Sequence, residues 1–111
     1  MLAILNTSIL TNFGNFTYQA ITLNQAREMV SNQQFISAIG HQATAEILTE
    51  LLGVNVPMNR INYRQEVSDQ AIVFKLNGRA PEGVILTRAE IERIGYTFGL
   101  LTMVRSNNVG A

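Results

Sequence analysis

The sequence contains no cysteine and only one histidine. Without cysteine, the chain can form neither a disulfide nor a thiolate metal site. A lone histidine, His41, also argues against a conventional zinc site within one chain. We therefore expect no metal and no other cofactor.

The sequence also lacks a charge bias, because eight Lys and Arg residues balance eight Asp and Glu residues. No basic excess indicates a protein that binds DNA or an anionic membrane surface, so an anionic ligand would have to be met by a local pocket. No apolar run approaches the roughly 18 residues of a membrane span. The first residues, MLAIL, lack the basic stretch of a signal peptide, so we expect a cytoplasmic protein.

The composition is 47% hydrophobic and only 14% charged over 111 residues, which fits one globular domain with a modest core. Few charges beside much apolar surface also hint at a homodimer. We expect one domain over residues 1–105 and a frayed tail over residues 106–111.

Hydrophobic periodicity predicts an α/β fold, with a mixed β-sheet of about five strands flanked by helices. Thr22 or Asn24 could cap the first helix, Gly53 ends the second, and the capping box Thr87-Arg-Ala-Glu starts the third. Residues 33–37 are ambiguous. The expected order is strand 2–5, strand 16–22, helix 25–33, helix 41–52, strand 59–66, strand 70–76, helix 87–94 and strand 96–104.

The strongest candidate for chemistry is Gly40-His41, at the start of the clearest helix. A helix N-terminus attracts phosphate through its free backbone N–H groups and its partial positive charge. Glycine lets a ligand approach the backbone, and a histidine there can protonate a leaving oxygen. The simpler interpretation is that His41 is only a polar helix cap.

Other candidates lie at the ends of predicted elements, where functional sites are usually built. Arg79 is flanked by glycine and alanine-proline in a stiff loop and could hold a phosphate, with Glu82 orienting it. Arg60 enters a predicted strand, and Asn6 and Ser8 follow the first one. Taken singly, each is better explained as a solvated polar residue.

Together these pieces resemble the type III anti-CRISPR ring nucleases of viruses and mobile elements, a family first catalogued as a domain of unknown function. The similarity runs from about residue 6 to residue 104. Its best-matching stretches are SAIGH at 37–41, Asn59-Arg60 and RAPEG at 79–83. Family members have an acidic residue and then Ser or Thr after the histidine, where this chain has Gln42 and Ala43.

The resemblance implies a homodimer with one shared pocket for cyclic tetra-adenylate, the second messenger that activates CRISPR ancillary nucleases. It implies that His41 is catalytic, that Glu82 assists, and that the ligand is bound by Asn6, Ser8, Gly40, Arg60 and Arg79. In this hypothesis, a ribose 2′-hydroxyl attacks the adjacent phosphorus without a metal, and the products are linear di-adenylates with a 2′,3′-cyclic phosphate. The location would be the host-cell cytoplasm if the protein is viral.

Two alternatives stay open at this point. The chain could sequester a cyclic oligonucleotide in the same pocket without cleaving it. It could also be a small dimeric interaction module with no affinity for oligoadenylates. DNA binding is disfavoured, because the net charge is zero and no helix is basic.

Overall fold

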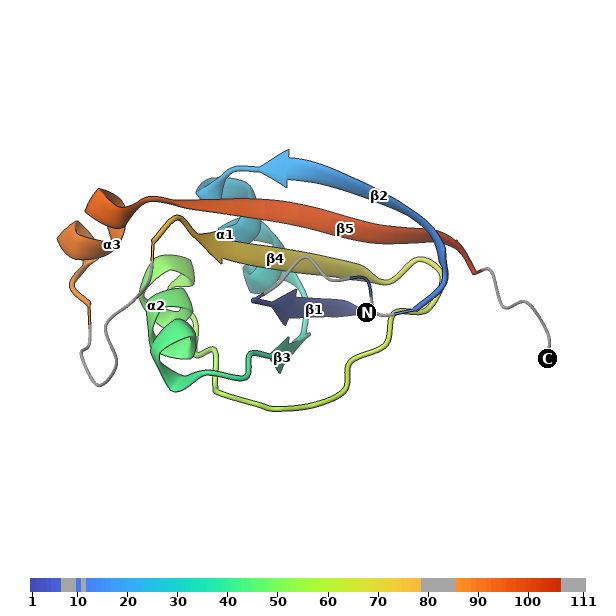
Figure 1. Cartoon of the computed structure of the whole chain (residues 1–111), viewed down its shortest axis with the longest axis horizontal. Helices are drawn as coiled ribbons and strands as arrows, with labels where there is room; N and C mark the ends of the chain where they lie inside the picture. The colour runs from blue at the N-terminus through green and yellow to red at the C-terminus, as the bar shows by residue number, and fades with distance from the viewer. Residues whose placement is uncertain (7–9, 11, 79–85, 107–111) are drawn as a thin grey trace.

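A computed structural model describes residues 1–6, 10, 12–78 and 86–106 of the chain (Figure 1). The described elements are five strands and three helices. In chain order they are β1 (Leu2–Leu5), β2 (Gly14–Ile21), α1 (Leu23–Asn32), β3 (Phe35–Ala38), α2 (Gln42–Leu52), β4 (Gln70–Leu76), α3 (Arg88–Ile94) and β5 (Tyr96–Ser106). The predicted α/β class with a five-stranded mixed sheet is confirmed.

The sheet has a parallel part and an antiparallel part, in the strand order β2-β5-β4-β1-β3. β1 is parallel to both of its neighbours, with Leu5 opposite Ala38 of β3 and Val73 of β4. β5 is antiparallel to β4 and to β2. Because β3, β1 and β4 run the same way, the chain leaves all three at one edge of the sheet, where ligands bind in many α/β proteins.

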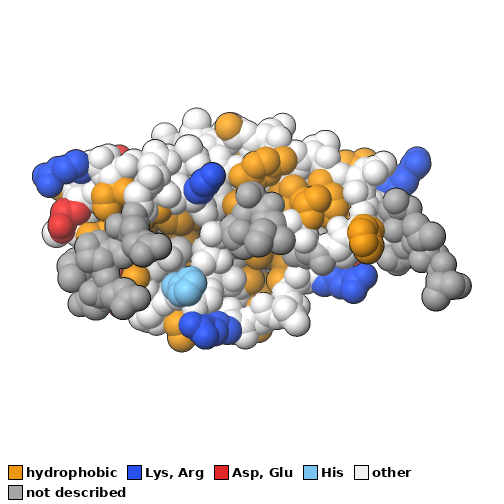
Figure 2. Space-filling view, in the orientation of Figure 1, with side chains coloured by type: hydrophobic (Ala, Val, Ile, Leu, Met, Phe, Trp, Pro, Cys, Tyr) orange, Lys and Arg blue, Asp and Glu red, His pale blue; other side chains and the backbone are white. Residues whose placement is uncertain are grey.

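The two faces of the sheet are covered differently. All three helices pack on one face, and residues such as Ile4, Leu48, Phe74 and Ile91 form a large core there. The opposite face carries a smaller cluster, to which no helix contributes a residue: Ala3, Leu5, Ala71, Val73 and Leu101. We call this second side the open face. Figure 2 shows hydrophobic side chains gathered there.

The predicted helix signals are confirmed in detail. Thr22, rather than Asn24, caps α1 and forms a capping box with Gln25. Thr87 and Glu90 form the same arrangement at α3. Gly53 ends α2 with φ of 73°, a left-handed conformation that glycine adopts without steric cost. None of the helices in the described ranges is long and apolar enough to cross a membrane.

One predicted strand is wrong, and another strand takes its place. Residues 59–66 belong to no strand of the sheet, whereas β3 begins within the ambiguous segment. The alternation that suggested a strand is real, since Tyr63 is half-buried and Gln65 is buried while their neighbours are exposed. It arises because these side chains lie against the open face, where Gln65 Nε2 donates to the carbonyl oxygen of Leu101 at 3.1 Å. The order is therefore strand-strand-helix-strand-helix-strand-helix-strand.

Side chains, more than a β-ladder, hold this segment at the edge of β3. Asn59 Nδ2 donates to the Ser37 carbonyl oxygen at 2.7 Å, and Ser37 Oγ donates to the Pro57 carbonyl oxygen at 2.6 Å. A single bridge joins Ile39 to Met58. These contacts satisfy backbone groups that an edge strand otherwise leaves open.

The predicted C-terminal tail begins too early. β5 continues through Ser106, which pairs with Gly14 of β2, so this residue belongs to the sheet. The antiparallel partner supplies the hydrogen bonds that extend the strand beyond its apolar part. The rest of the predicted tail, residues 107–111, lies outside the described residues.

Asp69 ties the turn before β4 to two other parts of the chain. Its carboxylate accepts hydrogen bonds from the Glu66 amide at 2.9 Å and the Tyr63 hydroxyl at 3.3 Å, and it pairs with the Met1 ammonium at 3.2 Å. Burial raises the pKa of Asp69, but these partners outweigh burial and hold the pKa below its usual value. The charged form is therefore the one that the fold stabilises.

We expect Asp69→Asn to lower the free energy of unfolding by about 1–2 kcal/mol at neutral pH. A pKa that is lower in the folded state gives stability that is complete above the unfolded value and is lost as the pH falls through the folded value. The deficit should therefore shrink below pH 3.8, the ordinary value for Asp69. Urea denaturation of both proteins across this range measures it. A deficit that stays constant into acid would contradict the assignment.

Candidate functional site

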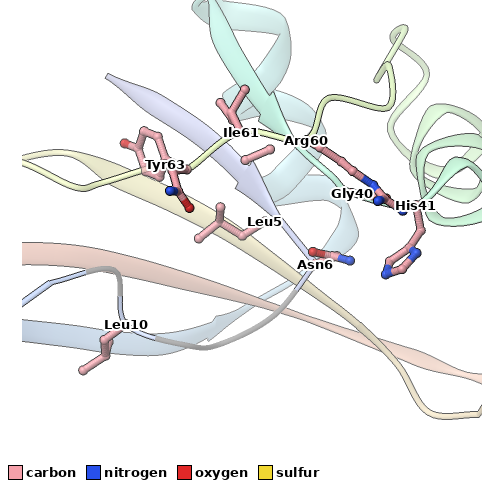
Figure 3. A pocket seen from close by; sticks show the side chains of 10 residues that line it. Leu5, Asn6, Leu10, Gly40, His41, Arg60, Ile61 and Tyr63 are labelled. Atoms are coloured by element: carbon pink, nitrogen blue, oxygen red, sulfur yellow. The ribbon is translucent and has the colours of Figure 1, made fainter.

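An open hollow of about 850 Å³ lies on the open face at the carboxyl ends of β1 and β3 (Figure 3). The end of β1, the link from β3 to α2 and the segment after Asn59 all contribute to it. The side chains and backbone that line it come from Leu5, Asn6, Leu10, Ala38, Gly40, His41, Arg60, Ile61, Asn62 and Tyr63.

Four of the predicted site residues meet in this hollow: Asn6, Gly40, His41 and Arg60. They come from three separate parts of the sequence: the parallel pairing of β1 with β3 brings Asn6 near Gly40 and His41, and Arg60 is bonded to Gly40. The other three predicted residues, Ser8, Arg79 and Glu82, lie outside the described residues. The part of the site that the structure describes is therefore the part built on β1, β3 and α2.

His41 is the N-cap residue of α2, and its side chain is not used for capping. Its backbone is extended, with φ of −131° and ψ of 131°, and the imidazole makes no capping hydrogen bond. The backbone carbonyl oxygen instead accepts the first helical bond, from the Ala45 amide at 3.0 Å. His41 therefore caps α2 through its backbone alone, and its exposed imidazole lines the hollow.

The N-terminus of α2 adds a favourable field for an anion. The first turn of this helix contains no acidic residue, so no side chain offsets the partial positive charge at its end. A Cβ placed on Gly40 would stand 3.6 Å from Arg60 Cγ, an ordinary contact. Packing therefore does not demand glycine at this position.

Arg60 is tethered beside the histidine. Its Nε donates to the Gly40 carbonyl oxygen at 2.8 Å, which fixes the side chain against the turn before α2. The residue is otherwise exposed, so the remaining guanidinium N–H groups stay available to a ligand. Figure 2 shows the pale blue histidine with a basic side chain close beside it.

The charge of the hollow has one sign. None of the described residues that line it is acidic, whereas His41 and Arg60 are basic residues. Among the residues that the structure describes, no group of three or more His, Cys, Asp or Glu side chains could hold a metal ion. The arrangement suits an anion held by N–H donors.

Tyr63 is a lining residue that the sequence analysis did not select. It falls within the predicted strand over residues 59–66. The usable signal was its position three residues after Arg60, since an aromatic ring close to a basic residue is typical of nucleic-acid binding surfaces.

The chain is similar to proteins of archaeal viruses and of a bacterium. A family model described as STIV B116-like matches residues 2–98. Uncharacterized protein 26 of Sulfolobus islandicus filamentous virus is 39% identical over 109 residues, which cover 94% of this chain and 92% of that protein. Uncharacterized protein YddF of Bacillus subtilis is 36% identical over 103 residues, which cover 91% of this chain and 95% of that protein.

A solved structure has the same fold. B116 of Sulfolobus turreted icosahedral virus superposes with a TM-score of 0.78 at 20% sequence identity. The match covers 91% of this chain and 97% of that chain. At this level of identity the likeness concerns the architecture, and functional conclusions have to come from the site.

Proposed function

The chain belongs to the STIV B116-like family, and from that premise we propose that it is a metal-independent ring nuclease. Two copies bind one cyclic tetra-adenylate and cleave it to linear di-adenylates, which shuts off type III CRISPR signalling. The observation that carries the proposal is the convergence of Asn6, His41 and Arg60 near the N-terminus of α2, in a hollow whose described lining residues include no carboxylate.

The proposed reaction needs little beyond geometry and one proton donor. The ribose 2′-oxygen attacks the adjacent phosphorus, the 2′-proton passes to solvent, and the bond from phosphorus to the 5′-oxygen breaks. His41 gives its proton to that departing oxygen, and the product carries a 2′,3′-cyclic phosphate. Such proton transfer contributes about 10²–10⁴-fold to a rate.

The remaining residues bind and orient the ring. Arg60 and the free amides at the start of α2 contact phosphoryl oxygens and stabilise their charge in the transition state. Asn6 offers an amide to a phosphate or ribose oxygen. Outside the described residues, the resemblance assigns Ser8 and Arg79 to binding and Glu82 to assistance in catalysis.

The proposed homodimer gives the single histidine two positions around the ring. In a two-fold assembly, one His41 from each copy faces each of two opposite phosphates. Leu10 and Ile61, both exposed apolar side chains that line the hollow, support a second copy on this side of the molecule. An isologous contact would cover these side chains and enclose the ligand.

Incubation with labelled cyclic tetra-adenylate in excess EDTA tests the proposal. We expect the product to be linear di-adenylate with a cyclic phosphate end. The mass of the protein in solution should be twice 12.3 kDa, as a homodimer requires. Recovery of the intact ring bound to the protein would instead favour a sequestering role. No measurable affinity would favour an interaction module, and strict dependence on a divalent ion would overturn the metal-free scheme.

A further inference from the structure

The hollow is chemically divided, with a basic end and an aromatic end. Gly40, His41 and Arg60 lie at the start of α2, whereas Tyr63 lies at the other side (Figure 3). Leu5 and Ile61 stand between them. A nucleotide has the same division, because its phosphate is charged and its base presents a flat apolar surface.

The aromatic ring of Tyr63 is supported on the side that faces the sheet. It packs against the apolar cluster of the open face, which includes Ala3 and Leu5, yet it remains only half-buried. Part of the ring is therefore held by the sheet and part is open to the hollow. An aromatic side chain placed in this way can receive a planar ligand with little loss of its own conformational freedom.

The hydroxyl of Tyr63 fixes the far end of the ring. It donates to Asp69 Oδ2 at 3.3 Å, and the same carboxylate accepts the Glu66 amide at 2.9 Å. Burial, and then the charge of Asp69 and this hydrogen bond, raise the pKa of Tyr63 to about 12. The phenol therefore stays neutral and keeps donating at physiological pH.

The backbone next to Tyr63 is also held in place, by hydrogen bonds from Gln65. The neighbouring Gln65 is only 1% exposed, and its Nε2 donates to the carbonyl oxygens of Asp69 at 3.0 Å and Leu101 at 3.1 Å. These bonds fix the segment to the open face next to Tyr63. The position of the ring is therefore determined before any ligand arrives.

We infer that Tyr63 is a stacking platform for an adenine base of the ligand. The inference rests on the proposed function for the identity of the ligand. Base stacking on an aromatic side chain is worth a factor of roughly 5–150 in affinity, as judged by alanine substitution. The phosphate at His41 and Arg60 and the base at Tyr63 would then share the binding energy.

The first test uses a probe smaller than the ring. Millimolar adenosine monophosphate should shift the aromatic NMR signals of Tyr63, whereas ribose 5-phosphate should leave them unchanged. Tyr63→Phe assigns the signals. Tyr18, which is 54% exposed, is the internal control for non-specific stacking and should not move.

The second test measures affinity for cyclic tetra-adenylate in a His41→Ala background, in which the ligand is not cleaved during the measurement. Tyr63→Ala and Tyr63→Leu should each weaken binding by roughly 5–150-fold, since leucine restores apolar packing but has no π-face. Tyr63→Phe keeps the ring and should bind nearly as the parent does. Thermal unfolding of each variant verifies that it is folded.

The outcomes separate this inference from the proposed function. Unmoved Tyr63 signals, equal shifts at Tyr18, or full affinity in Tyr63→Leu would overturn the platform and leave the ring nuclease intact. The wild type could fail to bind cyclic tetra-adenylate while adenosine monophosphate still shifts the NMR signals of Tyr63. In that case the proposed ring-nuclease function is wrong and the role of Tyr63 in stacking an adenine base stands.

Discussion

His41→Ala is expected to slow cleavage of cyclic tetra-adenylate by about 10²–10⁴-fold while most of the affinity remains. The imidazole caps no helix and lines the hollow, so its removal takes away the proposed proton donor without unmaking α2. Binding should survive because the positions of Arg60 and the helix amides do not depend on the imidazole of His41. Single-turnover rates and equilibrium binding of the same labelled ring give both numbers.

Gln42→Ala is the matched control for this prediction. Gln42 follows directly in the sequence, is exposed, and its Nε2 donates to Glu46 Oε1 within α2 at 3.2 Å. Its loss should leave the cleavage rate unchanged. A His41→Ala protein that cuts the ring at the native rate would remove His41 from the mechanism, whereas equal losses in both variants would indicate damage to the helix.

Phe74→Ala is expected to lower the free energy of unfolding by about 3–5 kcal/mol, because it leaves a cavity where the helices meet the sheet. Phe74 is 2% exposed, and its ring centroid lies 5.4 Å from that of Phe98 and 6.0 Å from that of Tyr96. The adjacent Val73 pairs with Leu5, so the same strand supports the hollow on its other face. Urea denaturation measures the loss.

Phe13→Ala makes the same chemical change on the surface. Phe13 is 79% exposed, so its truncation should alter stability by no more than about 0.5 kcal/mol. Similar losses at both positions would mean that the aromatic group of Phe74, Tyr96 and Phe98 is not the core element described above.

The sequence predicts most of the fold because its signals are local. Thr22 and Thr87 each have the N3 residue that completes a capping box, and Gly53 stands where α2 must turn left-handed. β3 was not predicted because it has only four residues and follows the end of α1 closely. The false strand over residues 59–66 shows that an alternating pattern reports which side chains face a surface, not which backbone groups pair.

The candidate site divides in the same way. Asn6 was predicted because it follows the first strand, and Gly40 and His41 were predicted because they start the clearest helix. Tyr63 was not, because its place depends on Asp69 and Gln65, which hold the segment to the open face through contacts that no local pattern encodes. The role of Arg79 and Glu82 stays a prediction.

The hollow is bounded by walls of two kinds, and this has a consequence for ligand exchange. One wall is made by the ends of β1 and β3, whose backbone bonds belong to the cooperative unit of the sheet. The other is the stretch from Arg60 to Tyr63, which belongs to no strand and is secured mainly through side chains at its two ends. Local opening of that stretch costs less than global unfolding. We therefore expect exchange of a bulky ligand to need brief local opening of this stretch and not unfolding of the sheet.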